Sequence, residues 1–167
     1  FKYPVLHLDL NAEKYDSREK LENLLVSQLK HWEARYGITS ANPSYSIRFM
    51  NVIRNAYEQT GRRVVVLIDE YDKPLLRSFH DEALQADFRE TLTAFYSVLK
   101  SADPWLQFVF ITGVTKFAQM GIFSNLNQLN DISFDSAYNT LCGMTRSEIE
   151  ATFAPELLQM TEKNKTD

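Results

Sequence analysis

The sequence is short of glycine, cysteine and excess positive charge, and each shortage excludes or disfavours one kind of site or surface. Its five glycines are scattered: Gly37, Gly61, Gly113, Gly121 and Gly143. None of them begins a Gly-x-x-x-x-Gly-Lys-Ser/Thr loop, the motif that cradles nucleotide phosphates. The single cysteine, Cys142, excludes an internal disulfide and a cysteine-rich zinc site. A net charge of −4 argues against a general nucleic-acid or membrane surface.

Long apolar runs are also missing. No stretch reaches the roughly 18 apolar residues that a membrane span requires, and no signal peptide precedes the first strand, so we expect a cytoplasmic protein without a membrane partner. With 167 residues, 44% of them hydrophobic, the chain can bury a sizeable core. We predict one domain over residues 1–161 and a disordered tail over 162–167. Since the chain starts at Phe1, at the threshold of a strand, we expect a piece of a longer protein.

The apolar pattern predicts alternating strands and helices. Predicted strands cover residues 5–10, 64–68 and 107–112, with a further short one at 132–134; predicted helices cover about 17–36, 42–60, 82–100 and 146–160, and a loop with a short helix covers 116–131. The run Val64–Ile68 is continuously apolar, which is typical of a parallel strand covered on both faces. This order predicts an α/β layer fold with a parallel sheet and right-handed crossovers.

Polar residues follow each predicted strand, where ligands bind in open α/β sheets. Asp9, the pair Asp69-Glu70 and Thr112 should therefore converge on one edge. Because successive strand residues point in opposite directions, we expect the two carboxylates to have different chemical roles. One can meet Mg²⁺ through its water shell, and the other can polarise a water for attack on a γ-phosphate. The alternative is that Asp69 caps the following turn and Glu70 is solvated.

Other polar residues have two interpretations each. Thr112 is a candidate to sense a γ-phosphate or orient the attacking water, or else a turn hydroxyl before Gly113. Thr115 and Lys116 are candidate nucleotide-binding residues, with a solvated surface lysine as the alternative at Lys116. His7, inside an apolar strand, is interpreted as a hydrogen-bonded core histidine, and Lys73 beside Asp72 as a member of a surface ion pair.

Several segments, in order along nearly the whole chain, resemble one known family, the bacterial AAA-ATPase-like proteins that commonly carry a C-terminal nuclease-like domain of the PD-(D/E)XK type. The segments are Tyr3–Asp9, Val64–Leu75, Phe110–Phe117, Ile122–Asn127 and Leu129–Ser133. The resemblance implies a three-layer, parallel-sheet P-loop NTPase core that takes ATP and Mg²⁺. It makes Val64–Glu70 the Walker B strand, with Asp69 at Mg²⁺, Glu70 as the catalytic carboxylate and Thr112 as a sensor-like residue.

In that family the phosphate-binding loop precedes the Tyr-Pro-Val strand. We therefore expect an incomplete core without the P-loop strand, a chain that is inactive alone, and ATP hydrolysis in the parent protein. Its expected partners are a nucleotide and either a second copy or the missing parts of the parent, because the missing strand would leave an unpaired edge. Nucleic acid is expected only through the absent nuclease-like domain.

Two alternative functions remain open. The first is an NTPase-like interaction or regulatory module without turnover. The second is a carboxylate metal site that cuts nucleic acid, which is disfavoured because Tyr71 stands where a PD-(D/E)XK site needs an acidic residue before Lys73.

Overall fold

A computed structural model describes residues 2–114, 119–123, 126, 129–141 and 143–163. The chain divides into two compact units, Phe1–Gln128 and Leu129–Asp167. The division does not test the prediction of one domain over 1–161, which stays a prediction. Most of the predicted tail, 162–167, lies outside the described residues.

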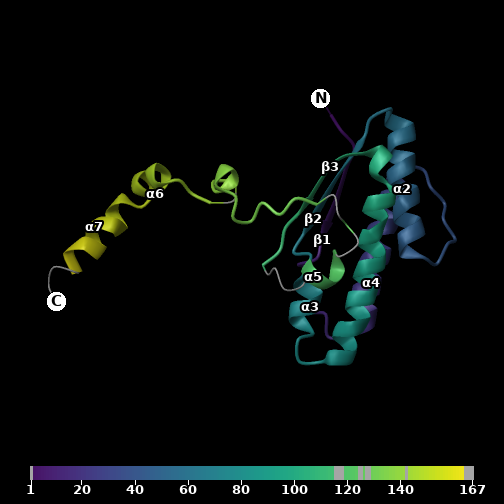
Figure 1. Cartoon of the computed structure of the whole chain (residues 1–167), viewed down its shortest axis with the longest axis horizontal. Helices are drawn as coiled ribbons and strands as arrows, with labels where there is room; N and C mark the ends of the chain where they lie inside the picture. The colour runs from purple at the N-terminus through teal and green to yellow at the C-terminus, as the bar shows by residue number, and fades with distance from the viewer. Residues whose placement is uncertain (1, 115–118, 124–125, 127–128, 142, 164–167) are drawn as a thin grey trace. The chain divides into compact units, whose positions relative to one another are not determined.

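The first unit is built on a sheet of parallel strands in the order β1-β2-β3 (Figure 1). The strands are β1 (Val5–Asp9), β2 (Val64–Asp69) and β3 (Leu106–Ile111). Each starts and ends within one residue of its prediction. The α/β class and the parallel sheet are therefore confirmed.

Both connections between the strands run in the same direction across the sheet. The first holds α1 (Arg18–Arg35) and α2 (Tyr45–Thr60); the second holds α3 (Lys73–Arg77), α4 (Glu82–Ser101) and a 3₁₀ turn, η1 (Asp103–Trp105). Right-handed crossovers in the same direction place their helices on the same face of a sheet. Figure 1 shows α2 and α4 side by side there, and α2 and α4 are in contact.

The burial of alternate residues along β2 reflects this one-sided arrangement. Val64, Val66 and Ile68 are buried against the helices, whereas Val65 and Leu67, on the other face, are half-buried. The prediction that β2 is covered on both faces is therefore wrong for the described part of the chain. Sheet and helices of this unit form two layers there, where a three-layer core was predicted.

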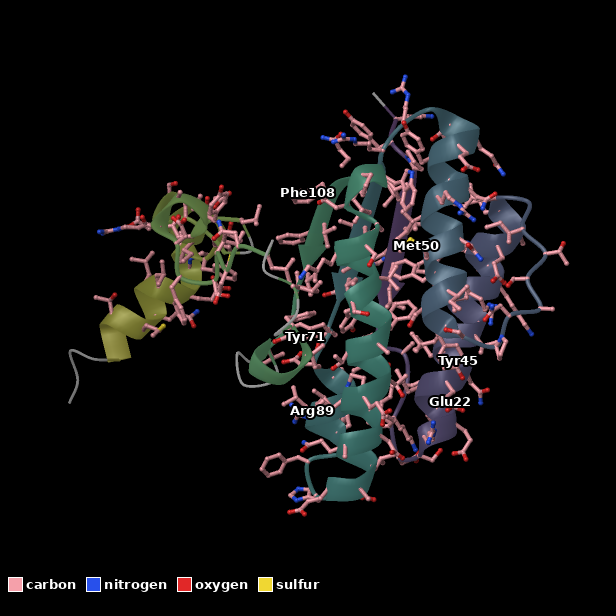
Figure 2. The ribbon with its side chains drawn as sticks, turned by 45° about the vertical axis from the view of Figure 1, so that its right-hand side comes forward. Glu22, Tyr45, Met50, Tyr71, Arg89 and Phe108 are labelled. Carbon is pink, nitrogen blue, oxygen red and sulfur yellow. The ribbon has the colours of Figure 1, made fainter. Side chains whose placement is uncertain are left out.

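The face of the sheet that points away from the helices, which we call the open face, continues onto the outer strands. Val65 pairs with Val5 on β1 and with Phe108 on β3. The side chain of Phe108 is 54% exposed, and its ring stacks on Phe110 with the centroids 6.0 Å apart. Figure 2 shows Phe108 on the side of the strand away from α2. His7 lies on this face and is exposed, so its interpretation as a core histidine is wrong.

Aromatic side chains fill the space between the helices. Trp32 of α1 stacks on Phe49 of α2, which stacks on Phe95 of α4, with centroid separations of 5.6 and 4.5 Å. Tyr96 then meets Phe95 edge-on at 6.0 Å. All four are buried. Each such pair contributes about 0.5–1.5 kcal/mol beyond the burial of its area, so the stack ties the three long helices together.

A buried ion pair joins α1 and α2 beside this stack. Arg48 donates from Nε to Glu33 Oε1 at 2.7 Å and from Nη2 to Oε2 at 2.8 Å. The side chains of Arg48 and Glu33 are only 8% and 7% exposed. The hydrogen bond to Glu33 raises the pKa of the Arg48 guanidinium. Loss of one partner would leave the other charge buried and unpaired, which is far more costly than loss of an exposed pair.

Helix ends follow the turn chemistry of the sequence in part. Gly61 ends α2 with a φ of 62°, as predicted from its position after the last helical residue. Helix α3 was not predicted. It starts next to Pro74, whose missing N–H costs nothing in a first helical turn, so the residue that stops the strand also opens a helix.

The second unit contains a 3₁₀ turn, η2 (Ser136–Tyr138), and two helices, α6 (Arg146–Thr152) and α7 (Ala154–Lys163). The prediction of one helix over 146–160 is wrong, because Pro155 has no N–H for an interior helical hydrogen bond and its ring opposes the carbonyl four residues earlier. Thr145 caps α6 as predicted, accepting from Glu148 N at 3.2 Å.

The predicted strand at 132–134 is a turn. Ser133 N donates to Asp131 Oδ1 at 3.0 Å, and Asp135 N donates to Ile132 O at 3.1 Å. These local hydrogen bonds use backbone groups that would otherwise pair with a neighbouring strand. The short α5 (Gln119–Ile122) lies inside the predicted 116–131 loop and belongs to the first unit. Among the described residues, no helix has the length and apolarity required to cross a bilayer.

We predict that Arg48→Met lowers the free energy of unfolding by about 3–5 kcal/mol, because Glu33 is left buried without its partner. The matched control is Arg54→Met on the same helix, where the pair with Glu58 is exposed at 4.0 Å. That change should cost at most about 1 kcal/mol. Urea denaturation followed by circular dichroism measures both. Equal losses in the two variants would contradict the importance of the buried pair.

Candidate functional site

The carboxyl ends of the strands meet in one row across the sheet. Asp9 and Asp69 are register partners on β1 and β2, and Thr112 follows the last residue of β3. Backbone hydrogen bonds continue beyond the paired strands: Leu10 N donates to Asp69 O at 3.1 Å, and Thr112 N donates to Ile68 O at 2.8 Å. We call Asp9, Asp69 and Thr112 the edge row. By strand alternation, the row lies on the open face of the sheet.

Asp69 and Thr112 are in direct contact. The Thr112 hydroxyl donates to Asp69 Oδ1, and Glu70 N donates to the same oxygen at 3.1 Å. Asp69 is exposed, and its Oδ2 accepts no hydrogen bond from the described residues. The structure thus brings these two predicted residues together and leaves one carboxylate oxygen directed away from both donors.

Glu70 leaves the strand through a left-handed backbone conformation, with a φ of 56°. This conformation is uncommon for a residue with a side chain, and a surrounding network must hold it. Here Lys73 N donates to Glu70 O at 2.9 Å, and Tyr71 N donates to Thr112 O at 3.0 Å. Asp69 and Glu70 therefore have separate surroundings, as predicted, but the cause is this turn and not strand alternation, since β2 ends at Asp69.

Lys73 connects Glu70 to the loop after β1. Its Nζ lies 4.0 Å from Glu70 Oε2 and donates to Asn11 Oδ1 at 2.8 Å. Asn11 N in turn donates to Asp9 Oδ1 at 2.7 Å. A surface pair between Lys73 and Asp72 was the wrong interpretation, because Asp72 is fully buried. Sequence reasoning missed the link to Asn11, which is 62 positions away.

Asp72 and Gly113 fix the turn behind the edge row. Both carboxylate oxygens of Asp72 accept from Val114 N, at 3.2 and 3.1 Å. A Cβ at Gly113 would collide with the Tyr71 ring and lie 2.7 Å from Asp72 Oδ1. Glycine is thus required here by close packing. The sequence signal for this was the Gly that directly follows Thr112.

Aromatic rings lie beneath this turn. Tyr71 lies beside α5 (Figure 2), and its ring centroid is 5.0 Å from Phe123, which is 5.3 Å from Tyr96. Burial raises the pKa of Tyr96 well above its usual value, with Tyr15, Tyr71 and Asp72 adding to the effect. The site turn is therefore packed against the same aromatic stack that joins the helices.

The donors at the edge row are hard oxygen ligands, the class that Mg²⁺ prefers. Within the described ranges there is no group of three or more His, Cys, Asp or Glu side chains that could hold a metal ion by itself. Mg²⁺ commonly uses one or two carboxylates together with water and substrate phosphates, and Asp69 suits that role. Thr115 and Lys116, the other predicted nucleotide-binding residues, lie outside the described residues.

Comparison with known proteins gives the family. A family model described as a predicted AAA-ATPase matches residues 1–123, the span that contains all three strands and the edge row. The chain belongs to this AAA-ATPase-like family. An uncharacterised protein in the vnfD 5′ region of Azotobacter chroococcum mcd 1 is 38% identical over 156 residues, 93% of this chain. The chain spans 30% of that relative's length. No solved structure matches the chain significantly.

We predict that Gly113→Ala lowers the free energy of unfolding by about 1–3 kcal/mol, the usual cost of forcing extra volume into packed surroundings. The comparison is Gly61→Ala, where a Cβ meets nothing within 4 Å and only the positive φ is unfavourable. That strain is worth about 1 kcal/mol. Amide exchange at Tyr71 and Val114 should accelerate only in Gly113→Ala. Unchanged exchange there would contradict the packing argument.

Proposed function

We propose that this AAA-ATPase-like chain supplies the Mg²⁺- and water-handling half of an ATP-hydrolysing site in a longer protein. The observation that carries the proposal is the contact between Thr112 and Asp69 at the carboxyl edge of a parallel sheet, with Glu70 next to them in a strained turn. Membership of a family of predicted AAA-ATPases supports the same reading.

Asp69 would face the metal. Its Oδ1 already accepts two hydrogen bonds, which fix the plane of the carboxylate and leave Oδ2 available. When bound with ATP, Mg²⁺ neutralises charge on the phosphate oxygens. Thr112 would act by orienting Asp69. Since its hydroxyl has one hydrogen and donates it to Asp69, its lone pairs remain to accept from a water at the edge row.

Glu70 would be the general base. It is about 30% exposed, so a water can reach it, and its turn separates it from Asp69. A positioned carboxylate that takes a proton from attacking water typically contributes 10²–10⁴-fold to a rate. The two acidic residues would therefore divide the work: one for the metal, one for the water.

Phosphate binding would need further residues. The 167 residues contain no phosphate-binding loop motif. We assign that function to other parts of the longer protein, with Thr115 and Lys116 as contributors from this chain. The 167-residue chain by itself should then be inactive towards ATP.

We predict that Glu70→Gln in the full-length protein lowers kcat for ATP hydrolysis by about 10²–10⁴-fold, because the amide cannot take a proton from water. Binding of Mg²⁺–ATP should change little, since the side chain keeps its size. A coupled phosphate-release assay and calorimetric titration measure the two quantities. The matched control is Glu58→Gln, an exposed glutamate on α2, which should behave as wild type.

The alternative, an interaction or regulatory module without turnover, makes the opposite prediction. Wild-type protein would then bind nucleotide weakly or not at all, with no phosphate release to lose. Hydrolysis that is equally fast in wild type and Glu70→Gln would refute the role given to Glu70.

A further inference from the structure

We propose that Lys73 is a positioning residue for Glu70, held in place by Asn11. This inference rests on the proposed function, because it concerns how the general base of that reaction is oriented. Lys73 would not touch ATP. It would act through the carboxylate of Glu70.

The surroundings of Glu70 create the need for such a residue. Its side chain has three torsions and is about 30% exposed, and its backbone adopts a left-handed φ of 56° just beyond the strand. No hydrogen bond to its carboxylate occurs in the described part of the chain, where its cationic partner is Lys73 at 4.0 Å. Without that charge, the carboxylate would sample many rotamers. A general base must lie within hydrogen-bond reach of the water that it activates. A carboxylate that samples many rotamers is therefore expected to lower the rate of ATP hydrolysis.

Lys73 is itself restrained, as an effective positioning group must be. Its side chain is only 22% exposed, and Nζ donates to Asn11 Oδ1 at 2.8 Å. Because an amide oxygen carries no formal charge, this bond fixes the ammonium without neutralising its attraction for Glu70. The backbone of Asn11 is held by Asp9 through its N–H at 2.7 Å. The contacts therefore run from the β1 end of the edge row, through Asn11 and Lys73, to Glu70.

The test uses full-length protein with Lys73→Met, which keeps an unbranched side chain one atom shorter and removes its charge. We expect kcat for ATP hydrolysis to fall at least about tenfold, as misplacement of a catalytic group does. Affinity for Mg²⁺–ATP and the melting temperature should stay close to wild type. Lys73→Arg should restore most of the rate. The matched control is Arg77→Met, which removes an exposed charge from the same helix and should leave kcat unchanged.

A double-mutant cycle separates positioning from other roles. In a Glu70→Gln background, Lys73→Met should cause no further loss of rate, since the group that it positions is gone. If Lys73→Met does not fold, Asn11→Ala releases the lysine while leaving its charge, and it should lower kcat in the same Glu70-dependent way.

Five results would overturn the proposal. A kcat for Lys73→Met equal to that of Arg77→Met would show that Lys73 does not position the carboxylate of Glu70. A loss of Mg²⁺–ATP affinity, or an equal further loss in the Glu70→Gln background, would make Lys73 a phosphate-binding residue instead. These three results leave the proposed function standing. Absence of hydrolysis by wild-type protein, or no effect of Glu70→Gln, removes the proposed function and this inference together.

Discussion

The parallel pairing of β2 between β1 and β3 is the constraint on which the rest of the structure depends. Its register sets Asp69 beside Asp9 on one side, and the backbone bonds beyond the strands hold Thr112 next to Asp69 on the other. A slip of one residue would turn Asp69 to the opposite face and separate it from Thr112. The buried residues of β2 oppose such a slip, because it would expose Val66 and Ile68. Core packing therefore maintains the geometry of the edge row.

Chirality explains the remaining architecture. The two crossovers run in one direction, and the right-handed rule for parallel strands then puts α1, α2 and α4 on one face. The aromatic stack and the Glu33–Arg48 pair hold these helices together. The same stack continues through Tyr96 and Phe123 to Tyr71 beneath the site turn. The edge row lies on the other face, where these helices do not reach. A rigid support on one side and access on the other suit a site for a ligand.

Much of this could be predicted from the sequence, because its signals are local or periodic. Continuous apolar runs identified the strands, and the rule that ligands bind at carboxyl ends selected Asp69, Glu70 and Thr112 before their contacts were known. The predictions that failed concern features set by the overall fold or by contacts between residues far apart in the sequence. One-sided cover of β2 follows from the direction of the crossovers. The link from Lys73 to Asn11 joins the ends of two different strands. The left-handed turn at Glu70 is held by a hydrogen bond from Tyr71 N to Thr112 O, just after β3. Pro155 was a local signal that should have divided the last helix.

The most direct test of the central claim, that the edge row is the Mg²⁺ and water side of an ATP site, is an experimental structure of the full-length protein with Mg²⁺ and a non-hydrolysable ATP analogue. The account predicts Mg²⁺ with its water shell against Asp69 Oδ2, the γ-phosphate near Thr112, and a water within hydrogen-bond reach of Glu70. A nucleotide bound elsewhere, with Asp69 and Glu70 facing bulk solvent only, would contradict it.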